Sequence, residues 1–557
     1  MRNTLEGWFS EARSVDGKIM IQYAFSTLPM RCNVKLAKSL FLKRSSFCSL
    51  LFSSHYTTGG IKMTGQGRTY AEALALLDIL ASNRTVVSMI QNSDRNVNLN
   101  AIPEMLGWLH KAGYLVEDLD KLKVIHVAGT KGKGSVCAII NSILQHCKQI
   151  PQTKYQGDEA RKLDKVGLYT SPHLISVRER IRINNSPISQ TLFASAFFAL
   201  WDRFTAAAIS AGHPDPESPE TKPGYFRYLT IMAFHVFLQE GVETAIIECG
   251  IGGEYDSTNI LSSKAVTVGV ITKLGIDHIG MLGDTIEKIS WHKGGIIKTG
   301  MCCFTVPQVE EAMVVLKERA AAKDAVLNVV TRRKEIENAE IKLGLEGDFQ
   351  KDNASLAIAV TEAHLEKIGL GGHLNPGKLA DEFVRGLEEV KWEGRCEVRK
   401  EGNIEWYVDG AHTIDSIEAA ARWFAEKLSG VPKGGAMLIF NQQTRDAPAL
   451  VRSLHFKLQQ TTGARHIFSN AAFCTNTPYR QDLQSTADIA ELTVQKATAD
   501  AWSELEPDTD IRILATIEDA VNNAREVAKD SNIFRVLVVG SLHLVGGFLR
   551  VLNGHSG

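Results

Sequence analysis

The sequence has almost no net charge and lacks a hydrophobic run long enough to cross a membrane. Its 62 Lys and Arg residues nearly balance 63 Asp and Glu residues, which gives a formal net charge of −1. A chain balanced in this way has no long-range attraction for nucleic acid, so a local group of basic side chains must hold any anionic ligand. No apolar stretch approaches the ~20 residues that span a bilayer. We therefore expect neither a nucleic-acid partner nor a transmembrane segment.

C-x-x-C pairs are also absent. The nine cysteines are scattered, and the adjacent pair Cys302 and Cys303 has no histidine cluster nearby. Because zinc sites bring such ligands together at close spacing, the pattern indicates free thiols in a reducing compartment. The length of 557 residues, 44% of them hydrophobic, predicts two large domains rather than one.

Acidic residues are missing from residues 17–71, a stretch that holds eight Lys or Arg residues. From Met30 onward the composition is rich in Arg, Lys and Ser, as in a mitochondrial presequence, although an ordinary polar tail is the alternative. Met63 precedes the first helical pattern and is a candidate second start, which would give a cytosolic form. We assign residues 1–62 to an N-terminal extension and expect mitochondrial and cytoplasmic forms through alternative starts.

Short apolar runs alternate with amphipathic stretches between about residues 64 and 390. This alternation predicts strands joined by helical crossovers around a mostly parallel sheet. The predicted strands are 124–128, 166–169, 244–248 and 266–271.

A second alternation follows a boundary near residue 390. It begins with IEWYVDGAH at 404–412, continues with AMLIF at 436–440 and ends with RVLVVGSLHLVGG at 535–547. We predict an ATP-binding domain over 63–390 and a smaller α/β domain over 391–557, with a ligand cleft between them.

A glycine-rich turn, VAGTKGKGS, occupies residues 127–135 between a predicted strand and a predicted helix. Free backbone N–H groups at a helix start converge on phosphate, a lysine neutralises it, and a hydroxyl can bind Mg²⁺. The turn departs from G-x-x-x-x-G-K-[ST], because Val127 takes the first glycine position and Gly134 separates Lys133 from Ser135. A chance glycine-rich loop is the alternative to the predicted ATP site.

Polar residues follow two other predicted strands. Glu248 ends the run TAIIE, and Asp277 and His278 follow the strand at 265–272. Carboxyl ends of parallel strands face the ligand crevice, where a carboxylate can hold Mg²⁺. Glu248 could instead be a solvated acid, and His278 could be structural, with Asp277 orienting its ring.

Together these motifs resemble the folylpolyglutamate synthase family, a branch of the ATP-dependent Mur ligases. The resemblance runs from about Met63 to the C-terminus and is of the eukaryotic type. It implies a P-loop domain with a mostly parallel sheet, of the Mur ligase central-domain type, followed by a smaller Rossmann-like α/β domain. The motifs are GTKGKGS at 129–135, LYTSPHL at 168–174, ECGIGGEYDSTN at 248–259, LGIDHIGMLGDT at 274–285 and HKGGIIK at 292–298.

The resemblance implies ligation of L-glutamate to the γ-carboxylate of reduced folate (poly)glutamates, a polyglutamylation that retains folate for one-carbon metabolism. ATP would form an acyl phosphate that the amine displaces. Implied cofactors are ATP and Mg²⁺, with room for a monovalent cation such as K⁺. A monomer is implied, in the mitochondrial matrix with association at the inner membrane, and in the cytoplasm.

Roles for individual residues also come from the resemblance. The implied nucleotide contacts are Gly129, Thr130, Gly132, Lys133, Gly134, Ser135, Gln350, Asn353, Arg395 and Asp409. The implied metal ligands are Ser135, Ser171, Glu248, His278 and Lys293, the last as a carbamate. The implied catalytic residues are Lys133, Glu248, His278, Lys293, Asp409 and His412. Thr413 stands where bacterial relatives have the Asn of DGAHN.

Two other functions stay open. A dihydrofolate synthase, or a bifunctional enzyme, would use the same ATP machinery on dihydropteroate. A nucleotide-binding regulatory protein could keep the loop without ligase chemistry, although Glu248, His278 and Lys293 argue against it. The folate site is expected in TSPHLISVRERIRIN at 170–184 or at 255–259, where Arg178, Arg180 and Arg182 could share a strand face or form a solvated edge.

Overall fold

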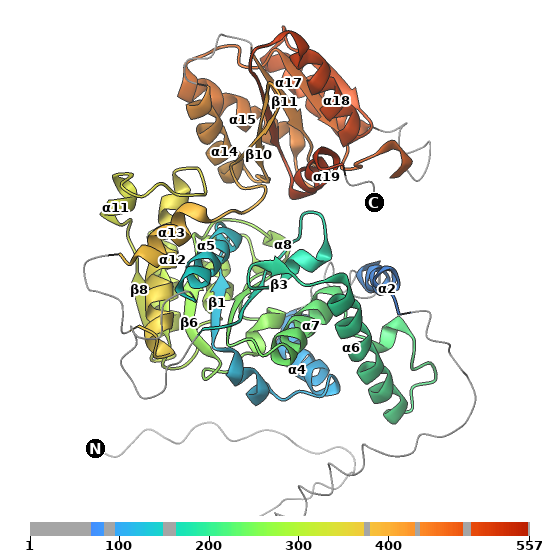
Figure 1. The fold of residues 1–557 in the computed structure, drawn as a ribbon, viewed down its shortest axis with the longest axis vertical. Helices are drawn as coiled ribbons and strands as arrows, with labels where there is room; N and C mark the ends of the chain where they lie inside the picture. Colours follow the sequence, from blue (N-terminus) through green and yellow to red (C-terminus); the bar gives the residue numbers. More distant parts are fainter. Residues whose placement is uncertain are drawn as a thin grey trace, which may run out of the picture. The chain divides into compact units, whose positions relative to one another are not determined.

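The structure is a computed structural model that describes residues 68–82, 95–148, 163–371, 379–428, 435–482 and 492–554. The predicted extension at 1–62 and the candidate start at Met63 lie outside these residues. Residues 65–557 form one unit that contains two β-sheets, each with its own helices (Figure 1).

The first sheet has eight strands in the order β4-β3-β2-β5-β1-β6-β7-β8. Its central strand β1 pairs in parallel with β5 and β6, and the antiparallel pairings are those of β3 with β2 and with the edge strand β4. The strands are β1 Val124–Ala128, β2 Val166–Tyr169, β3 Ile181–Ile183, β4 Ser186–Pro187, β5 Thr244–Glu248, β6 Val266–Ile271, β7 Cys302–Thr305 and β8 Val326–Val329. The four strands predicted from the sequence are β1, β2, β5 and β6, so the predicted α/β class is confirmed.

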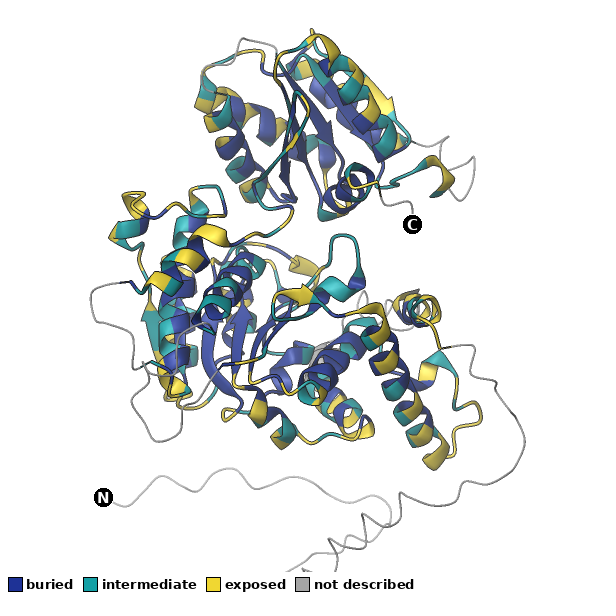
Figure 2. Ribbon diagram, viewed as in Figure 1, coloured by how far each residue is buried: buried dark blue, intermediate teal, exposed yellow. Residues whose placement is uncertain are grey.

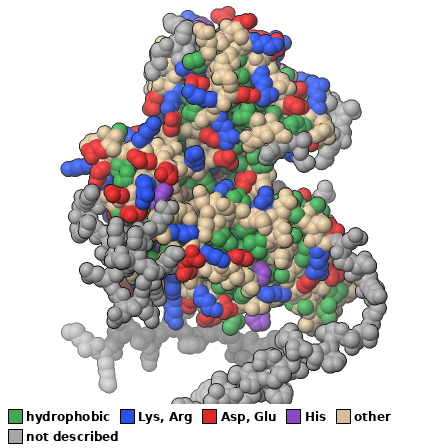
Figure 3. Space-filling model, viewed as in Figure 1, with side chains coloured by type: hydrophobic (Ala, Val, Ile, Leu, Met, Phe, Trp, Pro, Cys, Tyr) green, Lys and Arg blue, Asp and Glu red, His purple; other side chains and the backbone are tan. Residues whose placement is uncertain are grey.

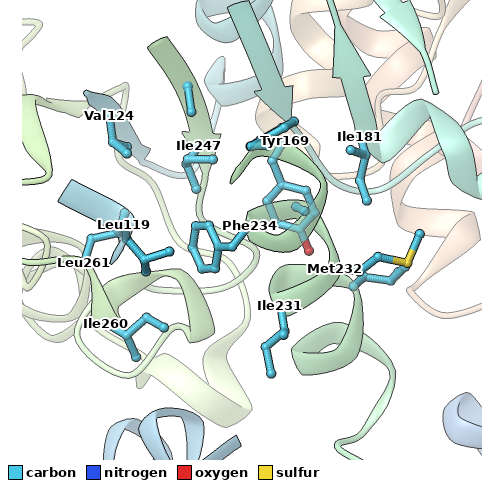
Figure 4. Packing of buried hydrophobic residues seen from close by; sticks show 14 of the residues in the cluster. Leu119, Val124, Tyr169, Ile181, Ile231, Met232, Phe234, Ile247, Ile260 and Leu261 are labelled. Carbon is cyan, nitrogen blue, oxygen red and sulfur yellow. The ribbon is translucent and has the colours of Figure 1, made fainter. Parts of the chain in front are cut away.

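Apolar residues run almost without interruption through β1 and β5 because both faces of the sheet are buried. In β1, Val124 and Ala128 face one core, whereas Ile125 and Val127 face the other. Figure 2 shows these strands buried throughout, with exposed residues on the outer helix faces. Figure 4 shows the first core, where Phe234 from a covering helix lies near Leu119 and Ile247.

Helices cover both faces of the first sheet. Figure 1 shows α5 Lys133–Cys147, α12 Phe349–Lys367 and α13 Asp381–Glu389 together on one side. The other helices of this part are α2 Tyr70–Ser82, α4 Arg95–Lys111, α6 Gln190–Ser210, α7 Tyr225–Gln239, α8 Ile279–Leu282, α9 Ile286–Gly294, α10 Glu310–Ala321 and α11 Lys334–Glu337, with 3-10 turns η1 Val116–Leu122, η3 Val177–Arg180, η4 Pro219–Thr221 and η5 Ser257–Ile260.

The expectation that no apolar stretch approaches the length of a membrane span does not hold for one helix in the described ranges, since α6 has the length and apolar composition that a span requires. Half of its most apolar window is buried inside the structure. Its aromatic side chains Phe197 and Phe204 pack on Tyr228 of α7, with ring centroids 4.8 and 5.6 Å from the tyrosine ring. The packing explains why this helix is so apolar.

The second sheet has six strands in the order β13-β12-β11-β14-β10-β9, all parallel except β9. The predicted alternation at 404–412, 436–440 and 535–547 contains β10, β11 and β14. The strands are β9 Glu397–Glu401, β10 Ile404–Asp409, β11 Ala436–Phe440, β12 Asn470–Cys474, β13 Asp510–Leu514 and β14 Phe534–Val539. The helices are α14 Ile414–Lys427, α15 Ala447–Thr462, α17 Thr493–Leu505, α18 Ile517–Val527 and α19 Leu542–Leu552, with turns η6 Arg480–Asp482 and η7 Ala528–Asp530.

All seven cysteines in the described ranges are free, as the sequence predicts, and six of them are buried. Burial disfavours a thiolate and raises the pKa of Cys147, Cys303 and Cys474 to about 12. Cys302 is half-buried, and burial raises its pKa as well. On the face seen in Figure 3, basic and acidic side chains are mixed, in keeping with the balanced composition.

We predict that Phe234→Ala destabilises the first core, because its side chain is fully buried. Such a substitution costs about 3–5 kcal/mol through lost burial and the cavity left behind. The urea midpoint of unfolding should fall clearly. The control is Phe456→Ala on α15, where the ring is 64% exposed and little change is expected. Equal shifts in the two variants would contradict the assigned core.

Candidate active site

The glycine-rich turn lies between the end of β1 and the start of α5, at the carboxyl edge of the first sheet. Gly132 caps α5 with a left-handed backbone, φ 86°. A Cβ at Gly129 would overlap the Thr272 side chain, and one at Gly132 would overlap the Asn353 amide. Only glycine fits at these two positions, so the loop can keep its N–H groups free at the helix start.

Two amides from α12 lie against this loop. The Gln350 amide donates a hydrogen bond to Ser135 Oγ at 3.3 Å, and the Asn353 amide donates to Gln350 Oε1 at 2.8 Å. All three side chains are buried. The structure therefore brings Gln350, Asn353, Gly132 and Ser135 together, although 215 residues separate Ser135 from Gln350 along the chain.

Glu248 ends β5 next to β1, in register with Val127. Its carboxylate is 3% exposed and accepts the Ser171 N–H at 3.0 Å. Burial raises the pKa of Glu248, and the positive charge of Lys133 opposes this shift. Ser171, Glu248 and Lys133 thus meet at the same sheet edge, where a buried carboxylate needs a cation nearby.

Lys293 points from α9 into the underside of the glycine-rich turn. Its amine is buried and donates to the Gly129 carbonyl at 2.7 Å. Burial lowers the pKa of Lys293 to about 7, and the charge of Lys133 adds to this effect. An amine with such a pKa is largely neutral slightly above pH 7 and can then act as a nucleophile. Sequence alone would have read Lys293 as an ordinary surface lysine.

His278 follows β6 and precedes α8 in the left-handed region, with φ 52° and ψ 42°. Its backbone N–H donates to Asp277 Oδ1 at 2.9 Å. Burial lowers the pKa of His278, which favours a neutral imidazole, while Asp277 opposes the shift. Thr130 Oγ1 donates to the Gly275 carbonyl at 3.1 Å, so the loop carrying His278 lies against the glycine-rich turn.

Asp409 ends β10 of the second sheet and is buried. Its two carboxylate oxygens accept the N–H groups of Cys396 and Ala411, each at 2.8 Å. Burial raises the pKa of Asp409, and Arg395 opposes the shift. His412 Nδ1 lies 2.9 Å from the Gly410 carbonyl, and burial lowers the pKa of His412 to about 4. In this structure Asp409 shapes the DGAH turn.

Residues of the second sheet reach the glycine-rich turn through a lysine that sequence reasoning left without a role. Lys131 Nζ donates to Thr413 Oγ1 at 2.7 Å and lies 3.5 Å from Asp277 Oδ2. Thr413 also caps α14. No local signal marks this contact, because 282 residues separate its partners.

The three arginines do not share a strand face, which was one of the two alternatives that the sequence left open. Arg178 and Arg180 lie in the turn η3, and only Arg182 lies in β3. Glu179 forms a capping box with Ser176, which favours the turn over an extended strand. Arg180 donates to His173, whereas Arg182 lies over the Trp392 ring at 5.3 Å.

Among the described residues, no three His, Cys, Asp or Glu side chains form a ready-made metal site. The oxygen donors that the sequence assigns to Mg²⁺ are the hydroxyls of Ser135 and Ser171 and the carboxylate of Glu248. Hydroxyl and carboxylate oxygens suit Mg²⁺, which keeps several waters and takes further oxygens from phosphates. The residues present therefore fit a nucleotide-bound Mg²⁺ better than a metal held by protein alone.

Comparison with known proteins decides the family. A folylpolyglutamate synthase of Neurospora crassa is 41% identical over 508 residues, covering 88% of this chain and 93% of the relative. The chain belongs to the folylpolyglutamate synthase family. A family member from Saccharomyces cerevisiae is 41% identical over 505 residues, covering 87% of each chain. A protein-family model described as dihydrofolate synthetase, C-terminal domain, matches residues 394–551.

Solved structures of folylpolyglutamate synthases share the fold. The Mycobacterium tuberculosis protein complexed with ADP has a TM-score of 0.61 and 22% identity, covering 87% of this chain and 99% of its own. The apo form from L. casei has a TM-score of 0.62 and 21% identity, covering 87% and 100%. These likenesses confirm the predicted two-part Mur ligase architecture.

We predict that Glu248→Gln lowers turnover without lowering the stability of the fold. Burial raises the folded-state pKa of Glu248, so its ionised form above that pKa is less favourable in the folded protein than in the unfolded chain. Gln removes this cost and still accepts the Ser171 N–H. The midpoint of thermal unfolding at pH 8 should therefore stay equal or rise.

Turnover of the same variant should fall by about 10²–10³, the usual loss for one electrostatic contact in a transition state. ADP release measures it. Glu318→Gln, on an exposed part of α10, is the control and should change neither quantity. Normal turnover in Glu248→Gln would remove this residue from the site.

Proposed function

We propose that this protein catalyses the ATP-dependent addition of L-glutamate to the γ-carboxylate of tetrahydrofolate and its polyglutamates. The observation that carries the proposal is the meeting of Lys133, Glu248 and Lys293 at one sheet edge, in a chain 41% identical to a folylpolyglutamate synthase over nearly its whole length. This activity is that of an acid–amino acid ligase.

The chemistry explains why a phosphate site is required. A carboxylate is a poor electrophile, but transfer of a phosphoryl group to one oxygen gives an acyl phosphate, and the glutamate amine then displaces phosphate. Lys133 and the free N–H groups at the start of α5 stabilise negative charge on the transferring phosphate. The protein contributes positioning and charge stabilisation rather than a covalent step.

Mg²⁺ would supply further charge neutralisation at the phosphates. Ser135 and Ser171 would hold a first Mg²⁺, and Glu248 would bridge to a second. His278 and a carbamylated Lys293 would complete the second position. The neutral amine of Lys293 can form an N–C bond to CO₂ and release one proton, which leaves an anionic carbamate whose oxygens can bind a metal. Asp409 would hold the DGAH turn that presents His412, and Arg395 would contribute a positive charge near Glu248.

Structures of related proteins support ATP and folate as ligands. The M. tuberculosis synthase has been solved with ADP and AMPPCP, and a further folylpolyglutamate synthase structure holds AMPPCP and folate. We extend these ligands to this chain because its glycine-rich turn leads into the start of α5, where Lys133 and Ser135 lie.

Dihydrofolate synthase activity is the second candidate. It is favoured by the match of residues 394–551 to a family model described as dihydrofolate synthetase. A bifunctional enzyme would combine both reactions in the same ATP site.

We also propose a monomer with mitochondrial and cytoplasmic forms. The acid-poor, basic stretch at 17–71 supports targeting to the mitochondrion, and Met63 supports a second start. K⁺ is proposed as an additional cation on the family resemblance alone.

Parallel assays with tetrahydrofolate and dihydropteroate test the proposed reaction. Purified protein with ATP, Mg²⁺ and L-glutamate should add glutamate to tetrahydrofolate, and the product masses report how many residues are added. A nucleotide-binding protein without ligase activity would release no phosphate with either acceptor. Turnover of dihydropteroate alone would replace the first candidate with the second.

A pH and CO₂ experiment tests Lys293. Enzyme freed of CO₂ should be weakly active at pH 8 and should gain activity when bicarbonate is added. At pH 6, below the pKa of about 7, the amine is mostly protonated, so bicarbonate should restore little. Lys293→Arg, with a permanent charge, should lose about 10²–10³ in turnover.

Lys288→Arg is the matched control, because Lys288 lies on the same helix with its side chain 60% exposed. This variant should keep wild-type turnover and the same bicarbonate response. If depleted wild-type enzyme were fully active at pH 8, the carbamate would be ruled out while the proposed reaction would stand.

A further inference from the structure

Arg445 lies in the turn between β11 and α15, at the carboxyl edge of the second sheet. Its guanidinium donates from Nη2 to Asp277 Oδ1 at 2.8 Å. Asp277 is only 6% exposed, whereas Arg445 is 35% exposed. The contact links the second sheet to the loop that follows β6 in the first sheet.

The Asp277 carboxylate interacts with three donor groups. Oδ1 accepts both Arg445 and the backbone N–H of His278, and Oδ2 lies 3.5 Å from Lys131 Nζ. Lys131 in turn donates to Thr413 at 2.7 Å. A nearly buried carboxylate needs such partners, so the position of Asp277 depends on groups from both sheets.

The backbone at His278 needs external support. Its left-handed conformation is uncommon for a residue other than glycine and is strained unless neighbours hold it. The hydrogen bond to Asp277 Oδ1 is such a support. Within the described part of the chain the His278 ring makes no hydrogen bond, so the backbone fixes where the imidazole lies.

We propose that Arg445 is a positioning residue for His278. It acts through Asp277: the guanidinium fixes the carboxylate, the carboxylate holds the His278 N–H, and the held backbone places the imidazole beside the glycine-rich turn. The contact would make the metal-binding geometry of the first sheet depend on a side chain of the second. This role rests on the proposed function, because His278 is assigned as a metal ligand only as part of that function.

Hydrogen exchange tests the positional part without any activity. In Arg445→Gln, amides of residues 274–282 should exchange about tenfold faster in the full chain, because local opening becomes easier. Asp277→Asn should accelerate the same segment. Lys427→Gln is the control, since it removes another contact between the two parts, the 2.7 Å ion pair with Glu346, without touching Asp277. Exchange at 274–282 should not change in this control.

Kinetics test the functional part. Arg445→Gln should lower kcat by about tenfold to a hundredfold and raise the Mg²⁺ concentration for half-maximal rate, because a displaced ligand weakens metal binding and misplaces the phosphate. KM for tetrahydrofolate should change little. Arg445→Lys keeps the charge and should recover part of both losses.

A double-mutant cycle decides whether Arg445 acts through Asp277. The Arg445→Gln and Asp277→Asn double variant should be no slower than Asp277→Asn alone, because the two residues form one chain of contacts. Fully additive losses, or unchanged exchange at 274–282 in Arg445→Gln, would overturn the proposal. If exchange changed in Arg445→Gln but the wild-type protein had no ligase activity, the positioning role of Arg445 would stand and the proposed function would be rejected.

Discussion

The carboxyl edge of the first sheet has no room for side chains at Gly129 and Gly132, and the site depends on this close packing. Thr272 lies against the first glycine and Asn353 against the second. Because Gly129 and Gly132 have no side chains, the segment after β6 and helix α12 can approach the turn. Their polar groups then lie close to the backbone N–H groups that are free to bind phosphate. A larger residue at either position would separate the turn from the groups that complete it.

Charge compensation is the second requirement of this edge. Glu248 and Lys293 are almost fully buried. Burial raises the pKa of Glu248 and lowers the pKa of Lys293, so it favours the neutral form of each side chain. Lys133 favours the charged form of Glu248 but the neutral form of Lys293. The charge of Lys133 therefore favours an ionised Glu248, which can bind a cation, and a neutral Lys293, which can react as an amine. Such shifted groups, gathered at a sheet edge, are typical of catalytic sites.

The sequence predicted the central strands well because runs such as TAIIE are apolar on both faces, a pattern typical of buried parallel strands. Glu248 lies at the end of β5 as predicted, whereas His278 lies farther on, in the loop between β6 and α8. The contacts of Lys131, Asp277 and Arg445 were not predicted, because their partners are far apart in the chain. The turn at Arg178 and Arg180 was not among the alternatives weighed, since alternation alone does not reveal the Ser176–Glu179 capping box.

The burial of the thiols has a practical consequence for spectroscopy. Native cysteines that are packed in the cores and held as thiols react slowly with maleimide reagents at neutral pH. A cysteine introduced on an exposed helix face, such as that of α15, would therefore be labelled preferentially, with Cys302 as the main competitor within the described residues. Replacing Cys302, together with Cys32 and Cys48 outside the described residues, would give a background suitable for attaching fluorophores. With one introduced cysteine near each sheet, distances between the two sheets could then be followed during turnover by energy transfer.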